Sequence, residues 1–440
     1  MNSVRLLLVL LVILFGGCTA SPLPESAPSD GESAPGDGES TPGPSDTETI
    51  PTGLIGPADF VYLGAFRLPE GTNGTNWEYS GHAMTCYPDG NPTGPADGFP
   101  GSLFGTGHDW YQQISEISIP VPVVSAGKNL GDLNTATTLQ PFHDIRSDVD
   151  TTELELLRAG LAYLPVQDAQ TTAKLHFCWG QHFQYEQVPS HGWCELDLFN
   201  PQTAGGWYIG EVTNFSTNDY MFEIPQAWAN AYASGMCLAT GRFRDGGLSG
   251  QGPTLLAIGP WTQGSPPAAG TRLNYVTLLQ YTLSGDYEAV QHTMNGYLHS
   301  DEWSGGAWLT AGDRAAVMFV GTKSEGSCWY GLSDGTVWPE QPPYPEDPEG
   351  ERGWWSTTFV GRIILYDPAD LAAVAAGTMQ PHEPQPYASL DIDSVLFNVQ
   401  STRQINHVGA CAFDRTSGIL YVFEYRADND KCLVHAWRVQ

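Results

Sequence analysis

The feature that most constrains this chain is a pattern of three apolar segments that recurs five times. In each repeat, a segment with Gly or Ala at crowded positions is followed by a second apolar segment that ends in polar residues or Gly, and then by a third with partial alternation. Such patterns are typical of β-strands with one covered face. The first strands are predicted at residues 80–89, 158–166, 233–241, 304–312 and 407–414. The second strands are predicted at 102–109, 174–182, 254–261, 315–323 and 419–426.

A small sheet of this kind cannot bury both of its faces alone. Repeated sheets therefore stack radially, which leaves only short, protected edges. The repeat glycines Gly81, Gly160, Gly235, Gly305 and Gly409 lie 79, 75, 70 and 104 residues apart, so long loops must join the strands. These observations predict an all-β fold, a single five-bladed β-propeller.

The two ends of the repeat region indicate how the ring closes. The last repeat ends at Gln440 without a fourth strand, whereas an additional apolar segment, residues 60–69, precedes the first repeat. We expect this N-terminal strand to complete the last blade, so that residues 51–440 form one domain.

The N-terminus carries an export signal. Residues 1–18 contain one Arg and an apolar run from Leu6 to Phe15, followed by small residues and Cys18. The run is shorter than the roughly 20 residues that span a bilayer, which favours a cleaved signal over a membrane-spanning helix. The segment Phe15-Gly16-Gly17-Cys18 resembles the lipobox of bacterial lipoproteins. This resemblance implies lipidation of Cys18 and attachment to the bacterial cell envelope or surface through a lipid anchor alone.

Residues 19–50 are rich in Ser, Pro and Gly and contain a near-repeat, SAPSDGE followed by SAPGDGE. With almost nothing to bury, this segment is expected to be a disordered acidic linker. Without its seven acidic residues and Arg5, the chain keeps 42 acidic and 17 basic residues, a net charge of −25. Such a surface repels nucleic acid and anionic lipid, so we expect neither as a partner. We expect a monomer.

Loops that enter a first strand and loops that leave a second strand open on the same end of a propeller, here called the mouth. Carboxylates, cations and aromatic residues are predicted there. The candidate catalytic residues are Glu78, Glu302, His108 and His182. The candidate substrate-binding residues are Tyr79, Arg158, Trp303, Lys323, Arg426 and His407.

Several chemistries remain open for this set. Arg and Lys pair with carboxylates, and aromatic rings stack on sugars, so a uronate or sulfated sugar fits. Glu78 and Glu302 stand in near-copied segments, EYSG and EWSG, and two facing carboxylates are the equipment of glycoside hydrolysis. A uronate lyase would instead use His or Tyr as a base, with Arg or Lys neutralising the developing charge. Duplicated blades also produce such pairs without catalysis.

Two other segments are candidates for secondary roles. Residues 331–353 form a long Pro-rich insertion in the fourth blade, whose Trp338 and Tyr344, with Trp329 before it, either cover the mouth or form a surface loop. Asp89, Asn91, Thr93 and Asp97 are spaced like the start of a calcium loop, but no Glu follows at the twelfth position. We expect no required cofactor, and a structural calcium ion has only this partial support.

The repeat region resembles five-bladed β-propeller proteins, among which are glycosidases and sugar-binding lectins. The resemblance implies a carbohydrate ligand and assigns no catalytic residue. We therefore expect a cell-surface lipoprotein that binds or cleaves an extracellular polysaccharide, as a glycoside hydrolase or polysaccharide lyase would. The alternative is a non-catalytic scaffold that binds a protein partner in the cell envelope.

Overall fold

The computed structural model describes residues 49–154, 157–184, 186–243, 245–282, 291–347, 350–401 and 403–440. The expected signal segment, Cys18 and residues 19–48 of the expected linker lie outside the described residues. Residues from Thr47 to Gln440 form one compact unit.

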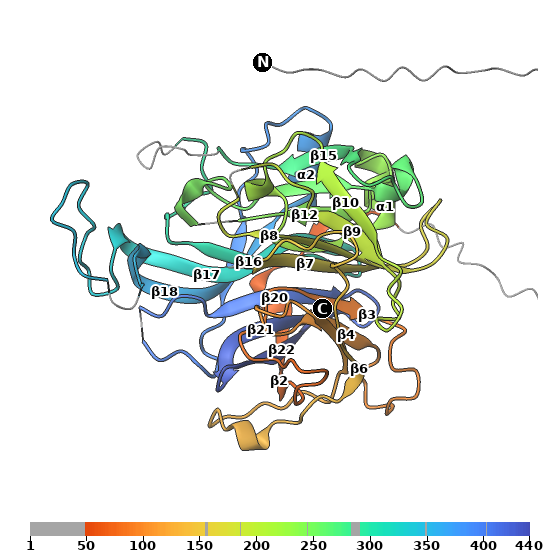
Figure 1. The fold of residues 1–440 in the computed structure, drawn as a ribbon, viewed down its shortest axis with the longest axis horizontal. Coiled ribbons are helices and arrows are strands. Elements are labelled where there is room, and N and C mark those ends of the chain that lie inside the picture. The colour runs from red at the N-terminus through yellow and green to blue at the C-terminus, as the bar shows by residue number, and fades with distance from the viewer. Residues whose placement is uncertain are drawn as a thin grey trace, which may run out of the picture. The chain divides into compact units, whose positions relative to one another are not determined.

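Five antiparallel sheets, here called blades 1 to 5 in chain order, make up the described unit (Figure 1). Blade 1 consists of β3 (Met84–Tyr87), β4 (Ser102–Thr106), β5 (Ile114–Ser118) and β6 (Thr138–His143). Blade 2 consists of β7 (Leu157–Leu164), β8 (Lys174–Gln181), β9 (His191–Cys194) and β10 (Ala204–Ile209), with β14 (Arg272–Leu273) parallel to β10. Blade 3 consists of β11 (Tyr220–Glu223), β12 (Leu238–Gly241), β13 (Leu255–Ile258) and β15 (Tyr275–Leu279).

Blade 4 has the longest strands. It consists of β16 (Glu302–Ala311), β17 (Arg314–Gly331), β18 (Gly353–Tyr366) and β19 (Ala388–Asp391), with β1 (Gly53–Leu54) parallel to the start of β17. Blade 5 consists of β20 (Val408–Asp414), β21 (Ile419–Asp428), β22 (Lys431–Val439) and β2 (Phe60–Arg67). The helices are α1 (Gln226–Tyr232), α2 (Pro368–Ala375) and the 3-10 turns Pro57–Asp59, Leu130–Asp132, Asn214–Ser216, Asp245–Gly247 and Pro260–Gln263.

The ring closes as the sequence predicts. β2 pairs antiparallel with β22, from Phe60 opposite Val439 to Arg67 opposite Leu433. The N-terminal strand thereby becomes the fourth strand of the last blade, and it buries Ala65 and Phe66 completely. The prediction of a five-bladed propeller closed by its N-terminal strand is confirmed.

The first strands of the blades line the axis of the ring. β3 contacts β7, β7 contacts β11, β11 contacts β16, β16 contacts β20, and β20 contacts β3. Glycine is required where these strands approach most closely, because a Cβ atom on Gly160 would lie 2.8 Å from backbone atoms of Tyr220 and Met221. The hydrophobic core lies between neighbouring blades, as in the cluster that joins Trp77 of the loop before β3 to Phe423 of β21.

Blade 3 differs from the prediction. Its first strand is β11, whose Tyr220, Met221 and Phe222 lack the small residues of the other first strands. The small residues of 233–241 instead form a turn, in which Ser234 has a φ of 52°, followed by the second strand β12. The predicted second and third strands of this blade are therefore β13 and β15, its third and fourth.

The cysteines make no disulfide among the described residues. Cys194 is paired with Leu175 in the ladder between β8 and β9, whereas Cys178 is paired with His191. The two thiols therefore occupy different positions along the ladder and do not form a cross-strand bridge.

Candidate functional site

The channel along the propeller axis is closed in its middle and widens at both ends. Its narrowest part, lined by residues in or next to the first strands that include Gly160, Asp219 and Gly306, has a volume of about 10 Å³. That is at most the space that one water molecule needs. The channel therefore consists of two separate cavities.

The cavity at the mouth is the larger, with a volume of about 790 Å³, within the range of ligand sites. It is lined by loops that precede first strands, including the loop before β20, and by loops that follow second strands. The lining residues are Tyr79, Ser80, His82, Asp109, Leu157, Arg158, His182, Glu302, Ser304, Asn398, Gln400, Gln404, Ile405, Asn406, Tyr425, Arg426, Asn429 and Asp430.

Arg158 lies at the base of this cavity and joins three blades. Its Nη1 donates to Glu302 Oε1 at 2.6 Å and to Asp219 Oδ2 at 3.2 Å, and its Nη2 lies 3.3 Å from His182 Nδ1. Asp219 precedes β11, and Glu302 is the first residue of β16. The guanidinium is thus held rigidly by two carboxylates from neighbouring blades.

Burial and charge together set the protonation of these groups. Burial raises the pKa of Asp219 to about 6, although Arg158 and Arg242 act in the opposite direction. Burial alone would lower the pKa of Arg158, but Asp219 and Glu302 outweigh it and raise that pKa. Burial, with a smaller effect of Arg158, lowers the pKa of His82 to about 4. His82 is therefore a neutral imidazole at neutral pH.

A loop rich in amide side chains forms one wall of the cavity. Asn398, Gln400, Gln404 and Asn406 all lie on it. Buried Glu424 fixes its start, because its carboxylate accepts hydrogen bonds from the backbone N–H groups of Phe397 at 2.9 Å and Asn398 at 2.5 Å.

Glu424 is in turn tied to the closing strand of the ring. Its Oε2 lies 2.7 Å from Nε2 of buried His435, and Nδ1 of that histidine lies 2.9 Å from the Tyr62 hydroxyl on β2. Burial and the nearby Glu424 raise the pKa of Tyr62, so the phenol stays protonated and donates to His435. The strand that closes the propeller therefore also supports the mouth.

Arg426 lies on the rim of the cavity, with its guanidinium carbon 5.2 Å from the centre of the Tyr79 ring. Its side chain is exposed and makes no hydrogen bond or ion pair with another described residue. Four lining residues have left-handed backbone conformations, Tyr79 (φ 52°), Asn406 (φ 59°), Arg426 (φ 48°) and Asn429 (φ 59°). The same conformation occurs at eight other described non-glycine residues, so it does not by itself mark a site.

The structure brings five of the predicted site residues into this cavity. They are Tyr79, Arg158, His182, Glu302 and Arg426. His108 lies just behind them, with its ring centre 5.3 Å from that of Tyr79. Glu78 is exposed and forms an isolated β-bridge with Lys431, outside the lining. Glu78 and Glu302 therefore have different surroundings and do not form a symmetric pair within the cavity.

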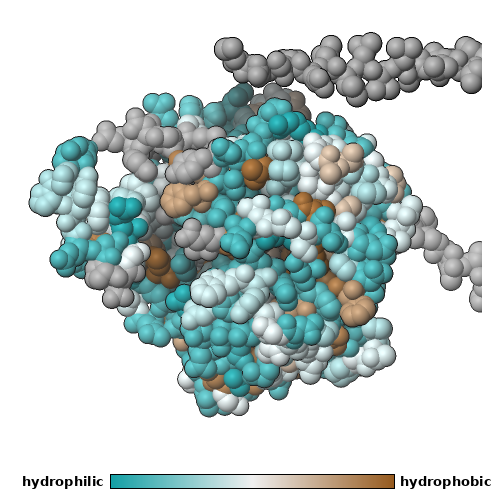
Figure 2. Space-filling view, viewed as in Figure 1, coloured by the Kyte–Doolittle hydropathy of each residue, from teal (hydrophilic) through white to brown (hydrophobic). Residues whose placement is uncertain are grey.

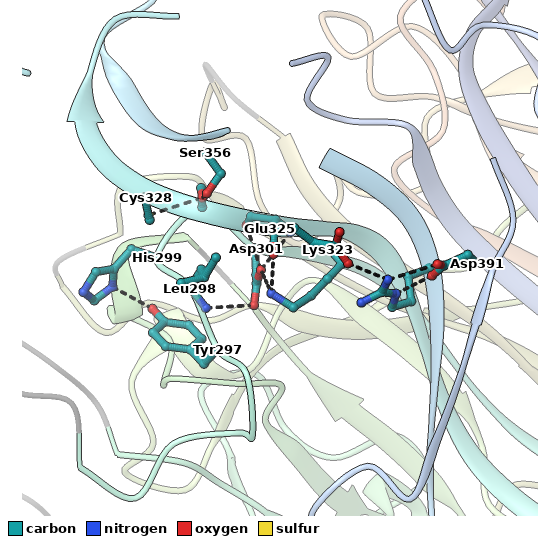
Figure 3. Close-up of polar contacts among 12 residues, drawn as sticks. Tyr297, Leu298, His299, Asp301, Lys323, Glu325, Cys328, Ser356 and Asp391 are labelled. Carbon is teal, nitrogen blue, oxygen red and sulfur yellow. Dashed lines mark hydrogen bonds and ion pairs between the residues drawn. The ribbon is translucent and has the colours of Figure 1, made fainter. Parts of the chain in front are cut away.

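Three predicted binding residues lie away from the cavity. Trp303 is completely buried in the core. Lys323 on β17 donates to Asp301 Oδ1 at 2.7 Å, and the same oxygen accepts from the Ser324 backbone N–H and hydroxyl (Figure 3). Burial raises the pKa of Asp301 even though Lys323 opposes the shift. Lys323 and Asp301 therefore form a structural ion pair.

His407 has a supporting position. Its Nδ1 lies 2.8 Å from Asp393 Oδ1 and its Nε2 lies 2.8 Å from the backbone oxygen of Gln404. The side chain is buried, so it holds the amide-rich loop rather than lining the cavity.

Sequence reasoning missed Asp219 and most of the amide-rich loop. Asp219 was overlooked because the first strand of blade 3 was assigned one strand too late. The strands predicted at 233–241 and 254–261 would put Tyr232 and Trp261 at the mouth, but these residues lie in the connection between β11 and β12 and after β13, at the opposite end. An acidic residue directly before an apolar run, as in NDYMFEIP at 218–225, was the available signal.

The insertion at 331–353 lies at the far end of the long β17–β18 hairpin, which extends beyond the blades (Figure 1). The Trp338 and Tyr344 rings stack with centres 5.6 Å apart, and neither lines the mouth cavity. The structure therefore favours a surface arm over a wall of the site.

Within the described ranges, no group of three or more His, Cys, Asp or Glu side chains is arranged to hold a metal ion. Among the same residues, no helix is both long and apolar enough to cross a membrane.

The fold defines the chain as a five-bladed β-propeller with a polar cavity at its mouth. No protein-family model matches the sequence, and no curated protein sequence matches it. Among solved structures, it is similar to a chain titled Kuenenia stuttgartiensis Hydrazine Synthase, with 9% identity, a TM-score of 0.30, and coverage of 80% of this chain and 76% of that chain. A likeness at this level carries no argument about activity.

Proposed function

We propose that this propeller binds an acidic extracellular polysaccharide at its mouth, on the surface of a cell to which Cys18 tethers it. The observation that carries the proposal is Arg426, a guanidinium on the cavity rim with no acidic partner among the described residues. Lys128, Arg352, Arg403 and Arg438 also make no ion pair with another described residue, but none of them lines the mouth cavity as Arg426 does. Arginine is well suited to bind a carboxylate or sulfate through two parallel hydrogen bonds.

The rest of the cavity supports a sugar ligand. Amide side chains both donate and accept hydrogen bonds, as the hydroxyl groups of a sugar require. Tyr79 is 37% exposed beneath Arg426 and provides a ring face for stacking. The face of the molecule drawn in Figure 2 is mainly hydrophilic, with apolar residues in separate patches.

Binding can be measured on a chain that begins at Thr47, the start of the compact unit. The ligands are oligomers of a uronate, of a sulfated sugar and of a neutral sugar, followed by calorimetry. We expect the acidic oligomers to bind, and Arg426→Ala to weaken them about 10- to 100-fold, because a hydrogen bond to a charged group contributes about 1.5–3 kcal/mol.

Arg438→Ala is the matched control. Arg438 is exposed on β22 at the other end of blade 5, opposite Ile419. This substitution should leave the affinity unchanged. Equal affinity of the Arg426→Ala variant for the acidic oligomers, or no binding to any oligomer, would remove the proposal.

Cleavage of the same oligomers is a separate possible outcome. It is measured after incubation with the protein by the appearance of reducing ends and by the absorbance of unsaturated uronates. Hydrolysis should depend on Glu302, tested as Glu302→Gln, and less on Glu78, tested as Glu78→Gln, because Glu78 lies outside the lining. Elimination should depend on His182, His108 and Arg158.

A protein-binding scaffold is the second candidate, and exposed aromatic residues near the mouth favour it. Trp110 is 79% exposed, Tyr111 55% and Phe183 54%. Large exposed aromatic side chains are frequent at protein interfaces. Replacing Trp110 with Ala would abolish capture of an envelope protein and leave sugar binding intact.

A further inference from the structure

The second cavity lies at the end of the channel opposite the mouth and has a volume of about 310 Å³. All five first strands and the loops that follow three of them contribute to it. Its lining residues are Met84, Thr85, Cys86, Pro88, Asp89, Tyr163, Pro165, Met221, Phe222, Glu223, Ala307, Trp308, Cys411, Ala412, Phe413, Arg415 and Thr416. The narrow middle of the channel separates this cavity from the mouth, so it is an independent site.

The cavity floor is apolar and rich in aromatic rings and sulfur. Phe222 and Trp308 are 8% and 2% exposed, and Met84 and Met221 lie beside them in the lining. Burial raises the pKa of Cys86 and of Cys411, which keeps both thiols neutral. Aromatic faces and polarisable sulfur attract apolar groups and cations.

The charges at the rim favour a cation over an anion. Arg415 is neutralised, because its Nη2 donates to Glu223 Oε2 at 3.0 Å. Asp89 is exposed and makes no hydrogen bond or ion pair with another described residue. The rim therefore carries one unneutralised negative charge, on a body that is itself strongly acidic and attracts cations over longer distances.

Tyr163 forms a side wall between Asp89 and the floor. Its ring centre lies 5.0 Å from that of Tyr87, and burial together with the nearby Asp89 raises its pKa to about 12. Tyr163 is therefore a neutral phenol whose ring can face a cation.

We infer that this second cavity binds a small organic cation, an ammonium group with an aromatic or aliphatic body. Its ammonium group would lie at Asp89 and Tyr163, and its apolar body would pack on Trp308, Phe222 and the two methionines. The volume of about 310 Å³ lies at the lower end of the range of small-molecule sites and therefore suits a small ligand. This inference does not depend on the sugar proposal, since it concerns the other end of the channel.

Three ligands of matched size test the charge preference on the full chain: 2-phenylethylammonium, 2-phenylethanol and phenylacetate. Calorimetry should show the tightest binding for the ammonium compound, weaker binding for the alcohol and the weakest for the anion. Equal or tighter binding of phenylacetate would overturn the inference, and so would no binding of the ammonium compound.

Asp89→Asn should weaken 2-phenylethylammonium about fivefold and leave 2-phenylethanol unchanged, since a partly exposed charge pair contributes up to about 1 kcal/mol. Asp97→Asn is the control, because Asp97 lies in the same loop but outside the lining. Equal losses in both variants would mean that only the overall charge attracts the ligand, and would count against the site.

The location is tested by NMR of methionine methyl groups. The ammonium compound should shift the Met84 and Met221 signals and leave that of Met379, which is not a lining residue, in place. Shifts at Met379 alone would place the ligand elsewhere and overturn the inference.

Discussion

The two ends of the propeller channel are built from the same five strands but differ in chemistry. At the mouth, charged side chains from blades 2, 3 and 4 meet at Arg158, which is 16% exposed. At the opposite end, apolar side chains form the floor, and the Arg415–Glu223 ion pair lies at the rim with side-chain exposures of 23% and 35%. The side chains at opposite ends of the same first strands, together with the adjoining loops, therefore give the two cavities their different chemistry. The substitutions below test this difference.

Removing the closing strand should have the largest effect and should damage both ends. A chain that begins at Gly71 lacks β2, and with it the buried residues Ala65, Phe66 and Leu68. We expect a loss of about 5 kcal/mol or more in the free energy of unfolding, which is most of the stability of a typical domain. Thermal unfolding measures it against a chain that begins at Thr47.

A peptide of residues 57–70, added to the shortened chain, should restore part of the lost stability by pairing with β22. If the shortened chain melted at the same temperature as the longer one, β2 would not close the ring.

The same substitution at the two ends should have very different effects. Arg158→Met leaves Asp219 and Glu302 without their cation in a buried place, which we expect to destabilise the protein by about 3–5 kcal/mol. Arg415→Met breaks a partly exposed pair and should cost less than about 1 kcal/mol. Urea unfolding of both variants measures the difference.

The loss in Arg158→Met should also depend on pH. Burial raises the pKa of Asp219 to about 6 even though Arg158 lowers it, so without Arg158 that pKa rises further and a proton neutralises the unpaired carboxylate already above pH 6. The destabilisation should therefore be smaller at pH 5 than at pH 8. Equal losses in the Arg158→Met and Arg415→Met variants would show that the two ends do not differ as described.

Tyr62→Phe should destabilise the protein much less than Arg158→Met and should act on one end only. It removes the hydroxyl that donates to His435, which supports Glu424 and the amide-rich loop. We expect about 1 kcal/mol of destabilisation, as for one hydrogen bond.

The Tyr62→Phe variant should also bind the mouth ligand several-fold more weakly, with unchanged affinity for 2-phenylethylammonium at the other end. Tyr387→Phe, which removes the hydroxyl that donates to the backbone oxygen of Ile55, is the matched control. Equal changes of affinity in both variants would show that the closing strand has no specific connection to the mouth.

Much of the fold could be predicted because it depends on periodic patterns. Alternation and small residues in each repeat are imposed by the pleat of the strands and by their close approach at the axis, as at Gly160. Blade 3 was misassigned because its first strand packs with Tyr220 and Met221 instead of small residues, so local pattern and tertiary position disagree there.

The amino-acid pattern alone predicts the number of blades, their order, the closing strand and the presence of cations and carboxylates near the mouth. Packing in the folded ring adds that Arg158, Asp219 and Glu302 meet, that Lys323 and His407 are buried as structural partners, and that Arg426 faces the cavity with no acidic partner among the described residues. The physical reason is that strand periodicity is a local property of the backbone. The burial and pairing of a charge, in contrast, depend on residues from other blades, up to 144 positions away for Arg158 and Glu302.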